Sequence, residues 1–178
     1  GFLMVLMQRL VSSSTRSIRT TLEKRLAVLE ESVPPTSADR SLDDDWWDLE
    51  TEEQIDEAVR AERSSHLTET KQVKNLLDLA RRCEAARPDA KAERLVDLIY
   101  SRCGEENNPN LKFLIFTEFV PTQQMLTEYL TARGFSVVCL NGSMDMDERR
   151  RTQQAFATDA QIMISTEAGG EGLNLQFC

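Results

Sequence analysis

Residues that build metal centres and disulfide frameworks are scarce in this sequence. It has one histidine, His66, no Cys-x-x-Cys pair, and four cysteines that lie far apart: Cys83, Cys103, Cys139 and Cys178. Zinc sites and disulfide frameworks need clustered ligands or paired cysteines. We therefore expect no metal-ligand set and no disulfide, but buried free thiols in a reducing cytoplasm and a solvated His66.

Long apolar runs are also missing. A membrane-spanning helix needs about 20 apolar residues in succession, and no stretch of the chain approaches that length. The apolar start, GFLMVLMQRLV, lacks the basic leader and the small-residue cleavage site of a signal peptide. We expect no membrane partner, and we interpret this start as a buried helix.

Basic residues are fewer than acidic ones, and the net charge is −9. Residues 30–69 hold 14 acidic and 3 basic residues, whereas the other 138 residues hold 16 acidic and 18 basic ones. One acidic segment therefore accounts for the whole imbalance. The acidic composition does not exclude a phosphate-binding face elsewhere in the chain.

Two familiar nucleotide-binding signatures are absent as well. No G-x-x-x-x-G-K-S/T loop occurs in the 178 residues. A G-x-G-x-x-G fingerprint that began at Gly170 would need a glycine at position 175, where Leu175 stands. The chain is thus predicted to contain neither the lysine-bearing phosphate loop nor a dinucleotide-binding fold.

The periodicity of the sequence changes near residue 109, from helical upstream to strand-like runs downstream, and we divide the chain into residues 1–88 and 89–178. Residues 1–88 form a predicted helical region with an acidic linker at about 32–50. Helices are predicted after the serines at 12–14, from Thr51 to Arg63, and from Leu67 to Cys83. Their inward-facing residues are Ile18, Leu22, Leu26 and Leu29 in the first of these helices, and Val73, Leu76, Leu77 and Ala80 in the last.

Residues 89–178 alternate between helical and strand patterns. A helix is predicted to open at Pro88–Asp89, with Leu95, Leu98 and Ile99 facing inward, and to end at the loop GEENNPN. Apolar strands are predicted at 111–116, 135–140 and 160–165, with helices at 121–133 and 147–158 between them. This order predicts an α/β fold with a parallel sheet that is covered on both faces.

Polar loops follow all three predicted strands: TEFVPT (117–122), NGSMD (141–145) and TEAGGEGLN (166–174). Ligands of open parallel sheets bind at the carboxyl ends of the strands. Threonine hydroxyls, backbone N–H groups and helix N-termini suit phosphate oxygens. Any one loop could be an ordinary turn, but three at one edge, beside the basic run ERRR (148–151), favour a phosphate-binding edge.

The segments KFLIFTEFVPTQQMLTEYL, LNGSMDMDERR and ISTEAGGEGLNL closely resemble three successive motifs of the second RecA-like lobe in superfamily-two helicases. The pattern is most similar to the helicase C-terminal domain of Swi/Snf-type ATPases. Within these, it looks most like the bacterial branch that includes the RNA-polymerase-associated recycling ATPase. The resemblance covers residues 89–178 and implies a partial RecA-like lobe with three recognisable strands, whereas residues 1–88 look only loosely like the helical insertions before that lobe.

The resemblance implies roles for particular residues. Those at positions that contact the nucleic-acid backbone are Thr117, Asn141, Gly142, Arg149 and Thr166. Those at positions facing ATP and the opposing lobe are Gly170, Glu171, Gly172 and Asn174, although Glu171 replaces an apolar residue common in remodelling relatives. No catalytic residue and no metal ligand is implied within this chain.

The resemblance further implies a fragment of a DNA-dependent ATPase that uses ATP and Mg²⁺, neither expected to bind the fragment alone. Its implied partners are DNA, a first RecA-like lobe and, in the bacterial branch, RNA polymerase, at the nucleoid. An arginine-finger helix is implied beyond Cys178. An alternative is a non-catalytic module that docks a basic partner through the acidic segment around Trp46 and Trp47. One of these tryptophans could equally pack against the following helix.

We predict that the 178-residue chain by itself hydrolyses no ATP and binds it weakly or not at all. The phosphate loop is absent from it, and the resemblance places the arginine fingers in a helix that follows. Phosphate release from the purified chain, measured with and without DNA, checks this expectation. DNA-stimulated release would contradict it.

Overall fold

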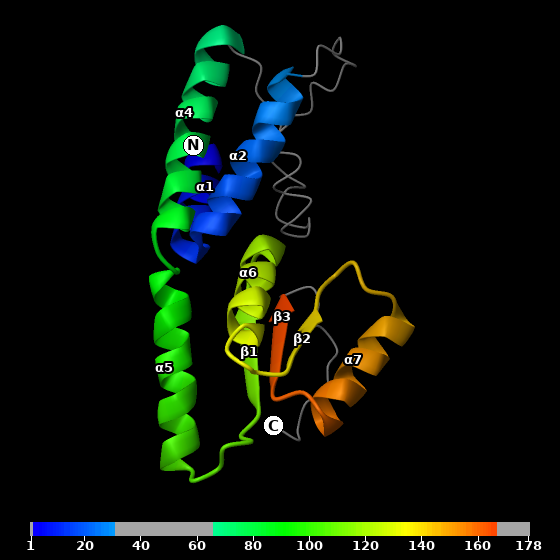
Figure 1. Ribbon diagram of the computed structural model, residues 1–178. Coiled ribbons are helices and arrows are strands. Elements are labelled where there is room, and N and C mark those ends of the chain that lie inside the picture. The colour runs from blue at the N-terminus through cyan, green and yellow to red at the C-terminus, as the bar shows by residue number, and fades with distance from the viewer. Residues whose placement is uncertain (1, 31–65, 167–178) are drawn as a thin grey trace. The chain divides into compact units, whose positions relative to one another are not determined.

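The computed structural model describes residues 2–30 and 66–166 (Figure 1). The chain divides into two compact units, residues 1–86 and 87–178. The predicted helix from Thr51 to Arg63, the acidic segment with Trp46 and Trp47, and the glycine loop lie outside the described residues. Among the helices that are described, none has the length and apolar character needed to cross a membrane.

The helices of the first unit are α1 (Phe2–Ser13), α2 (Thr15–Glu30) and α4 (His66–Ala86). The serine that separates α1 from α2 caps the second helix, as predicted. Ser14 Oγ accepts a hydrogen bond from the backbone N–H of Ser17 at 3.1 Å, which satisfies one of the donors left open at a helix start.

An apolar stripe joins α2 to α4. Leu22, Val73, Leu77 and Ala80 form its buried centre, and Ile18, Leu26 and Leu29 pack against it. The prediction that Leu76 also faces inward is wrong, because its side chain is 53% exposed. Leu76 precedes the buried Leu77 by one residue and so projects about 100° away around the helix. It lines an open apolar groove of about 560 Å³ along α1, α2 and α4.

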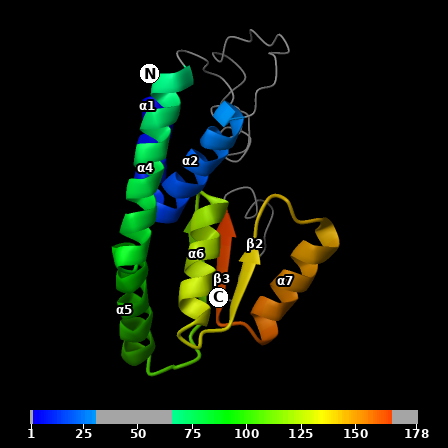
Figure 2. The same ribbon diagram turned by 45° about the horizontal axis from the view of Figure 1, so that its top comes forward.

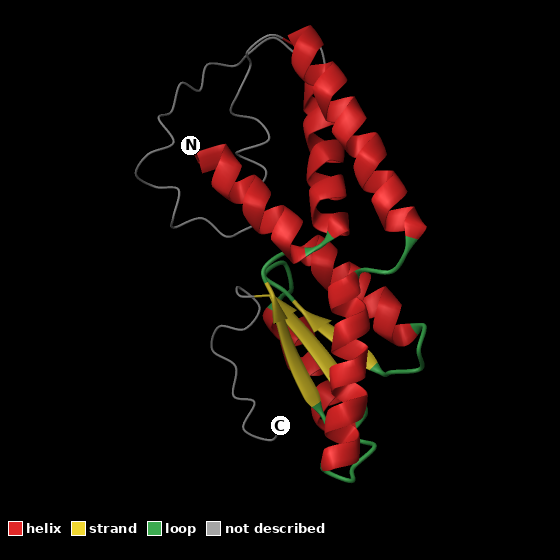
Figure 3. Ribbon diagram, turned by 90° about the vertical axis from the view of Figure 1, so that its left-hand side faces the viewer, coloured by secondary structure: helices red, strands yellow, loops and turns green. Residues whose placement is uncertain are grey.

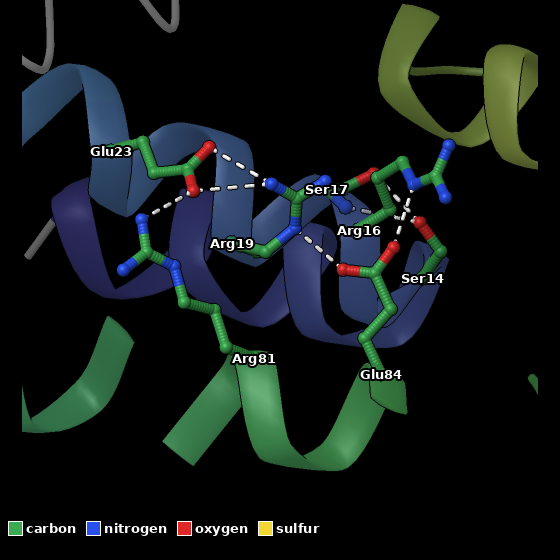
Figure 4. A network of polar contacts seen from close by, with 7 residues as sticks. All are labelled: Ser14, Arg16, Ser17, Arg19, Glu23, Arg81 and Glu84. Carbon is green, nitrogen blue, oxygen red and sulfur yellow. Dashed lines mark hydrogen bonds and ion pairs between the residues drawn. The ribbon is translucent and has the colours of Figure 1, made fainter. Parts of the chain in front are cut away.

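A network of ion pairs reinforces the contact between α2 and α4 (Figure 4). The Glu84 carboxylate accepts from Arg16 Nε at 2.7 Å and from Arg19 Nε at 2.5 Å. Glu23 accepts from Arg19 and from Arg81 Nη2 at 2.9 Å. Partial burial opposes ionisation of both glutamates, but the hydrogen bonds from arginine outweigh it and lower the pKa of Glu23 and of Glu84.

We predict that Glu84→Gln destabilises the first unit by about 1 kcal/mol at pH 7. Because the pKa of Glu84 is lower in the folded state, its contribution is present above the unfolded-state value near 4.5 and is lost as the pH falls through the folded one. Urea unfolding followed by the methyl NMR signals of Leu22 and Leu77 at several pH values measures this. The difference in free energy of unfolding between wild type and variant should disappear as the pH is lowered.

Asp78→Asn is the matched control, because Asp78 pairs only along its own helix with Arg82 and both side chains are 70% exposed. It should change the free energy of unfolding by less than about 0.5 kcal/mol. A Glu84→Gln effect as small as that of the control would show that the network adds nothing to stability.

The second unit is α/β, as predicted. Its elements are α5 (Ala90–Glu105), β1 (Phe113–Thr117), α6 (Val120–Thr131), β2 (Val137–Leu140), α7 (Met146–Thr158) and β3 (Ile162–Thr166). The three strands are parallel and stand in the order β1-β3-β2. Each begins two residues later than predicted. Helix α5 continues through Gly104 and Glu105, which were predicted to lie in a loop.

Helices cover both faces of this sheet (Figures 2 and 3). On one face, α5 and α6 pack Val96, Ile99, Leu126 and Leu130 against Ile162 and Ile164 of β3. On the other face, Phe156 of α7 packs with Met163 of β3 and with Leu140. Successive strand residues point to opposite faces, so the central strand β3 contributes to both layers and all five of its residues are buried.

The helix that opens this unit begins where predicted. Asp89 caps α5 by accepting a hydrogen bond from the Lys91 N–H at 2.9 Å. The prediction that Leu98 faces inward is wrong, since it is 46% exposed. The buried stripe instead runs through Ala92, Val96 and Ile99, whose spacings of four and three residues keep them on one helical face.

Candidate nucleic-acid interface

The strand register brings the predicted contact residues to one edge of the sheet. Thr117, the last residue of β1, stands opposite Thr166, the last residue of β3. Leu140 ends β2 opposite Ser165, so Asn141 leaves the sheet beside Thr166. Thr117 is half-buried and Thr166 is buried. The loops after β1 and β2 therefore start on either side of the carboxyl end of β3.

A buried glutamine ties this edge together. Gln123 lies in the first turn of α6 and is 2% exposed. Its Nε2 donates to the backbone oxygen of Leu140 at 2.9 Å and to that of Ile164 at 2.8 Å. Its Oε1 accepts from Nδ2 of Asn141 at 3.2 Å. One side chain thus joins the end of β2 and the middle of β3 to the loop that follows β2.

The loop after β2 is closed by its own polar groups. Ser143 Oγ donates to Oδ1 of Asn141 at 2.7 Å. From the first turns of α7, Arg149 Nε donates to the Met144 oxygen at 3.1 Å, and Arg149 Nη2 donates to the Gly142 oxygen at 3.2 Å. The half-buried guanidinium therefore lies against the loop and holds it. The neighbouring Arg150 and Arg151 are exposed.

The start of α7 is occupied by acidic side chains. Asp145 Oδ1 accepts from the Glu148 N–H at 2.8 Å, and Glu148 Oε2 accepts from the Asp145 N–H at 3.0 Å. This reciprocal arrangement is a capping box. The two carboxylates add negative charge at the start of α7, which opposes binding of a phosphate there.

We predict that Asp145→Ala lowers the stability of the second unit by about 1 kcal/mol, since the cap of α7 is lost. Asp145→Asn keeps the capping acceptor and should cost only a few tenths of that. Urea unfolding of the two variants, followed by the NMR signals of Phe156 and Met163, gives the comparison. Equal losses would show that the charge of Asp145 matters and its capping bond does not.

The other predicted functional residues have different outcomes. The residues expected near ATP, namely Gly170, Glu171, Gly172 and Asn174, lie outside the described residues, as does the His66 side chain. The cysteines within the described ranges are free, but the expectation that they are buried is wrong: Cys83 is exposed, and Cys103 and Cys139 are half-buried. Burial raises the pKa of the Cys139 thiol, which contacts Thr127 Oγ1 at 2.9 Å.

Sequence reasoning missed Gln123, although a signal for it was present. The buried residues of α6 are Thr122, Gln123, Leu126 and Leu130. Gln123 thus shares a helical stripe with two buried leucines, at spacings of three and seven residues. A glutamine on an apolar stripe indicates a buried amide that must find hydrogen-bond partners, and backbone oxygens of β2 and β3 provide two of them.

Comparison with known proteins identifies the family of residues 90–178. The family described as "Helicase conserved C-terminal domain" matches residues 90–178. The uncharacterized ATP-dependent helicase YqhH of Bacillus subtilis is 38% identical over 90 residues, which cover 51% of this chain and 15% of that protein. The ATP-dependent DNA helicase DDM1 of Arabidopsis thaliana is 36% identical over 70 residues, or 37% of this chain and 9% of that protein.

A human relative, the lymphoid-specific helicase, is 36% identical over 67 residues, which cover 36% of this chain and 8% of that protein. The matched region therefore spans between 8% and 15% of the length of these three relatives. The residues matched by the family, 90–178, include the sheet.

Proposed function

Because this chain belongs to the helicase conserved C-terminal domain family, we propose that it supplies the DNA-backbone grip of an ATP-driven translocase. In this proposal it is the second RecA-like lobe of a Swi/Snf-type ATP-dependent helicase, which is supported by the matched family and by relatives that are named as ATP-dependent helicases. The observation that supports the grip is the gathering of Thr117, Thr166, Asn141, Gly142 and Arg149 at the carboxyl edge of one parallel sheet.

The chemistry of this edge suits phosphate oxygens better than base edges. Threonine, asparagine and serine side chains and the backbone N–H groups of a loop donate hydrogen bonds without carrying charge. Residues 87–166 contain 11 acidic and 9 basic residues, so no broad positive field surrounds the edge. Binding should therefore be independent of DNA sequence and depend only modestly on salt.

The ATP-driven part of the function rests on the relatives. YqhH and DDM1 are named as ATP-dependent helicases, and the residues that the resemblance assigns to ATP lie outside the described ranges. We propose that ATP and Mg²⁺ act where this lobe meets a first RecA-like lobe. In this proposal the polar edge moves along the DNA backbone as the two lobes open and close. RNA polymerase remains a proposed partner.

We predict that Arg149→Ala in the full-length protein weakens DNA binding evenly across sequences. It should lower the slope of log affinity against log salt concentration by about 1, because one phosphate contact is lost. ATP affinity should hardly change. Titration with fluorescent DNA duplexes of two unrelated sequences, at four salt concentrations, provides the measurement.

Arg151→Ala is the matched control. It removes the same charge from the same helix, but Arg151 is exposed and lies about 200° further around α7 from Arg149. Its salt slope should stay close to that of the wild type. If Arg149→Ala leaves both the affinity and the slope unchanged, Arg149 only closes the loop and the proposed grip is wrong.

A further inference from the structure

We infer that Gln123 is a positioning residue for the DNA contact made by the loop after β2. This inference rests on the proposed function, because it assigns to Gln123 the task of presetting the loop that binds the backbone. Gln123 is 2% exposed, so it does not reach DNA itself. It acts through Asn141.

The hydrogen bonds of Gln123 fix the orientation of its carboxamide. A glutamine side chain has two N–H donors on Nε2 and an acceptor on Oε1. Nε2 donates to the backbone oxygens of Leu140 and Ile164, at 2.9 and 2.8 Å. Because Leu140 is the last residue of β2 and Ile164 lies in the middle of the paired strand β3, these two hydrogen bonds hold Oε1 facing Asn141.

Asn141 links Gln123 to the loop by hydrogen bonds. Its Nδ2 donates to Gln123 Oε1 at 3.2 Å, so its Oδ1 is directed away from α6. Oδ1 there accepts from the Ser143 hydroxyl at 2.7 Å. A single line of hydrogen bonds thus runs from β2 and β3 through Gln123 and Asn141 to Ser143. It sets the conformation of the turn that contains Gly142.

Packing alone does not require an amide at this position. Gln123 shares the buried stripe of α6 with Leu126 and Leu130, and an apolar side chain would fill the same place. Burying a carboxamide costs free energy unless its polar atoms find partners. Here two of the three partners, Leu140 and Asn141, lie where β2 leads into the loop that carries the proposed DNA contact, which is why we assign the amide to positioning.

This assignment gives Gln123 a signature that differs from that of Arg149. Loss of a positioning residue loosens the loop but removes no cation, so the number of phosphates neutralised stays the same. Affinity for DNA should therefore fall at every salt concentration while the salt slope is unchanged. Loss of Arg149 should lower the slope.

The test compares Gln123→Met with Thr127→Val in the full-length protein. Thr127 lies one turn further along α6. Its Oγ1 donates to the backbone oxygen of Gln123 and contacts Cys139 Sγ, and neither of these partners lies in the loop after β2. Both variants are uncharged, and both remove a hydrogen bond between α6 and its surroundings. Gln123→Leu is the second apolar variant, for use if Gln123→Met does not fold.

The expected results concern DNA affinity and amide hydrogen exchange. Gln123→Met should bind DNA about three- to tenfold more weakly at each salt concentration, with a wild-type slope. Amide hydrogen exchange of residues 141–144, measured without DNA, should become faster. Thr127→Val should leave both properties close to those of the wild type. In an Asn141→Ala background, the Gln123→Met change should weaken DNA binding less than twofold further, because the two side chains act in series.

Two outcomes would overturn the inference. One is DNA affinity in Gln123→Met that falls no more than in Thr127→Val, which would leave Gln123 with a role in stability only. The other is unchanged hydrogen exchange of residues 141–144. If the wild-type protein shows no salt-dependent DNA binding at all, the proposed function fails, and the exchange measurement alone then decides whether Gln123 orders the loop.

Discussion

The pairing of β3 with β1 on one side and β2 on the other is the contact on which the second unit depends. Alternate residues of β3 enter the cores on the two faces of the sheet: Ile162 and Ile164 meet α5 and α6, and Met163 meets the α7 side. The same pairing sets the register of Thr117 against Thr166 and of Leu140 against Ser165. One strand therefore forms the core and also aligns the edge at which function is proposed.

Hydrogen bonding, more than charge, organises that edge. Gln123 donates to the backbone carbonyls of Leu140 and Ile164, and Arg149 donates to those of Gly142 and Met144. Asp145 and Glu148 meanwhile neutralise the start of α7. The loop is thus ordered by hydrogen bonds and has a single arginine against it. This arrangement fits recognition of a phosphate backbone by its shape more than by a strong positive field.

In the first unit, by contrast, charged side chains hold the helices together. Arg16, Arg19 and Arg81 are held by Glu84 and Glu23, and the buried Arg25 is bound to Glu69. These four arginines donate to glutamates across the contact between α2 and α4, so they are poor candidates for a phosphate-binding surface. Its exposed apolar groove shows that the described helices do not enclose all of their own apolar surface.

The sequence by itself determined the types of element, the parallel sheet and the polar residues that follow each strand, because apolar periodicity and helix caps are local properties. Ser14 and Asp89 cap helices where predicted, whereas Leu76 and Leu98 were misplaced because one residue turns a helix by about 100°. Only the tertiary structure decided the strand order β1-β3-β2 and the partners of Gln123 and Arg149. Strand order and side-chain partners depend on which segments meet in space, and no local pattern encodes a contact between residues that lie 18 or 41 positions apart.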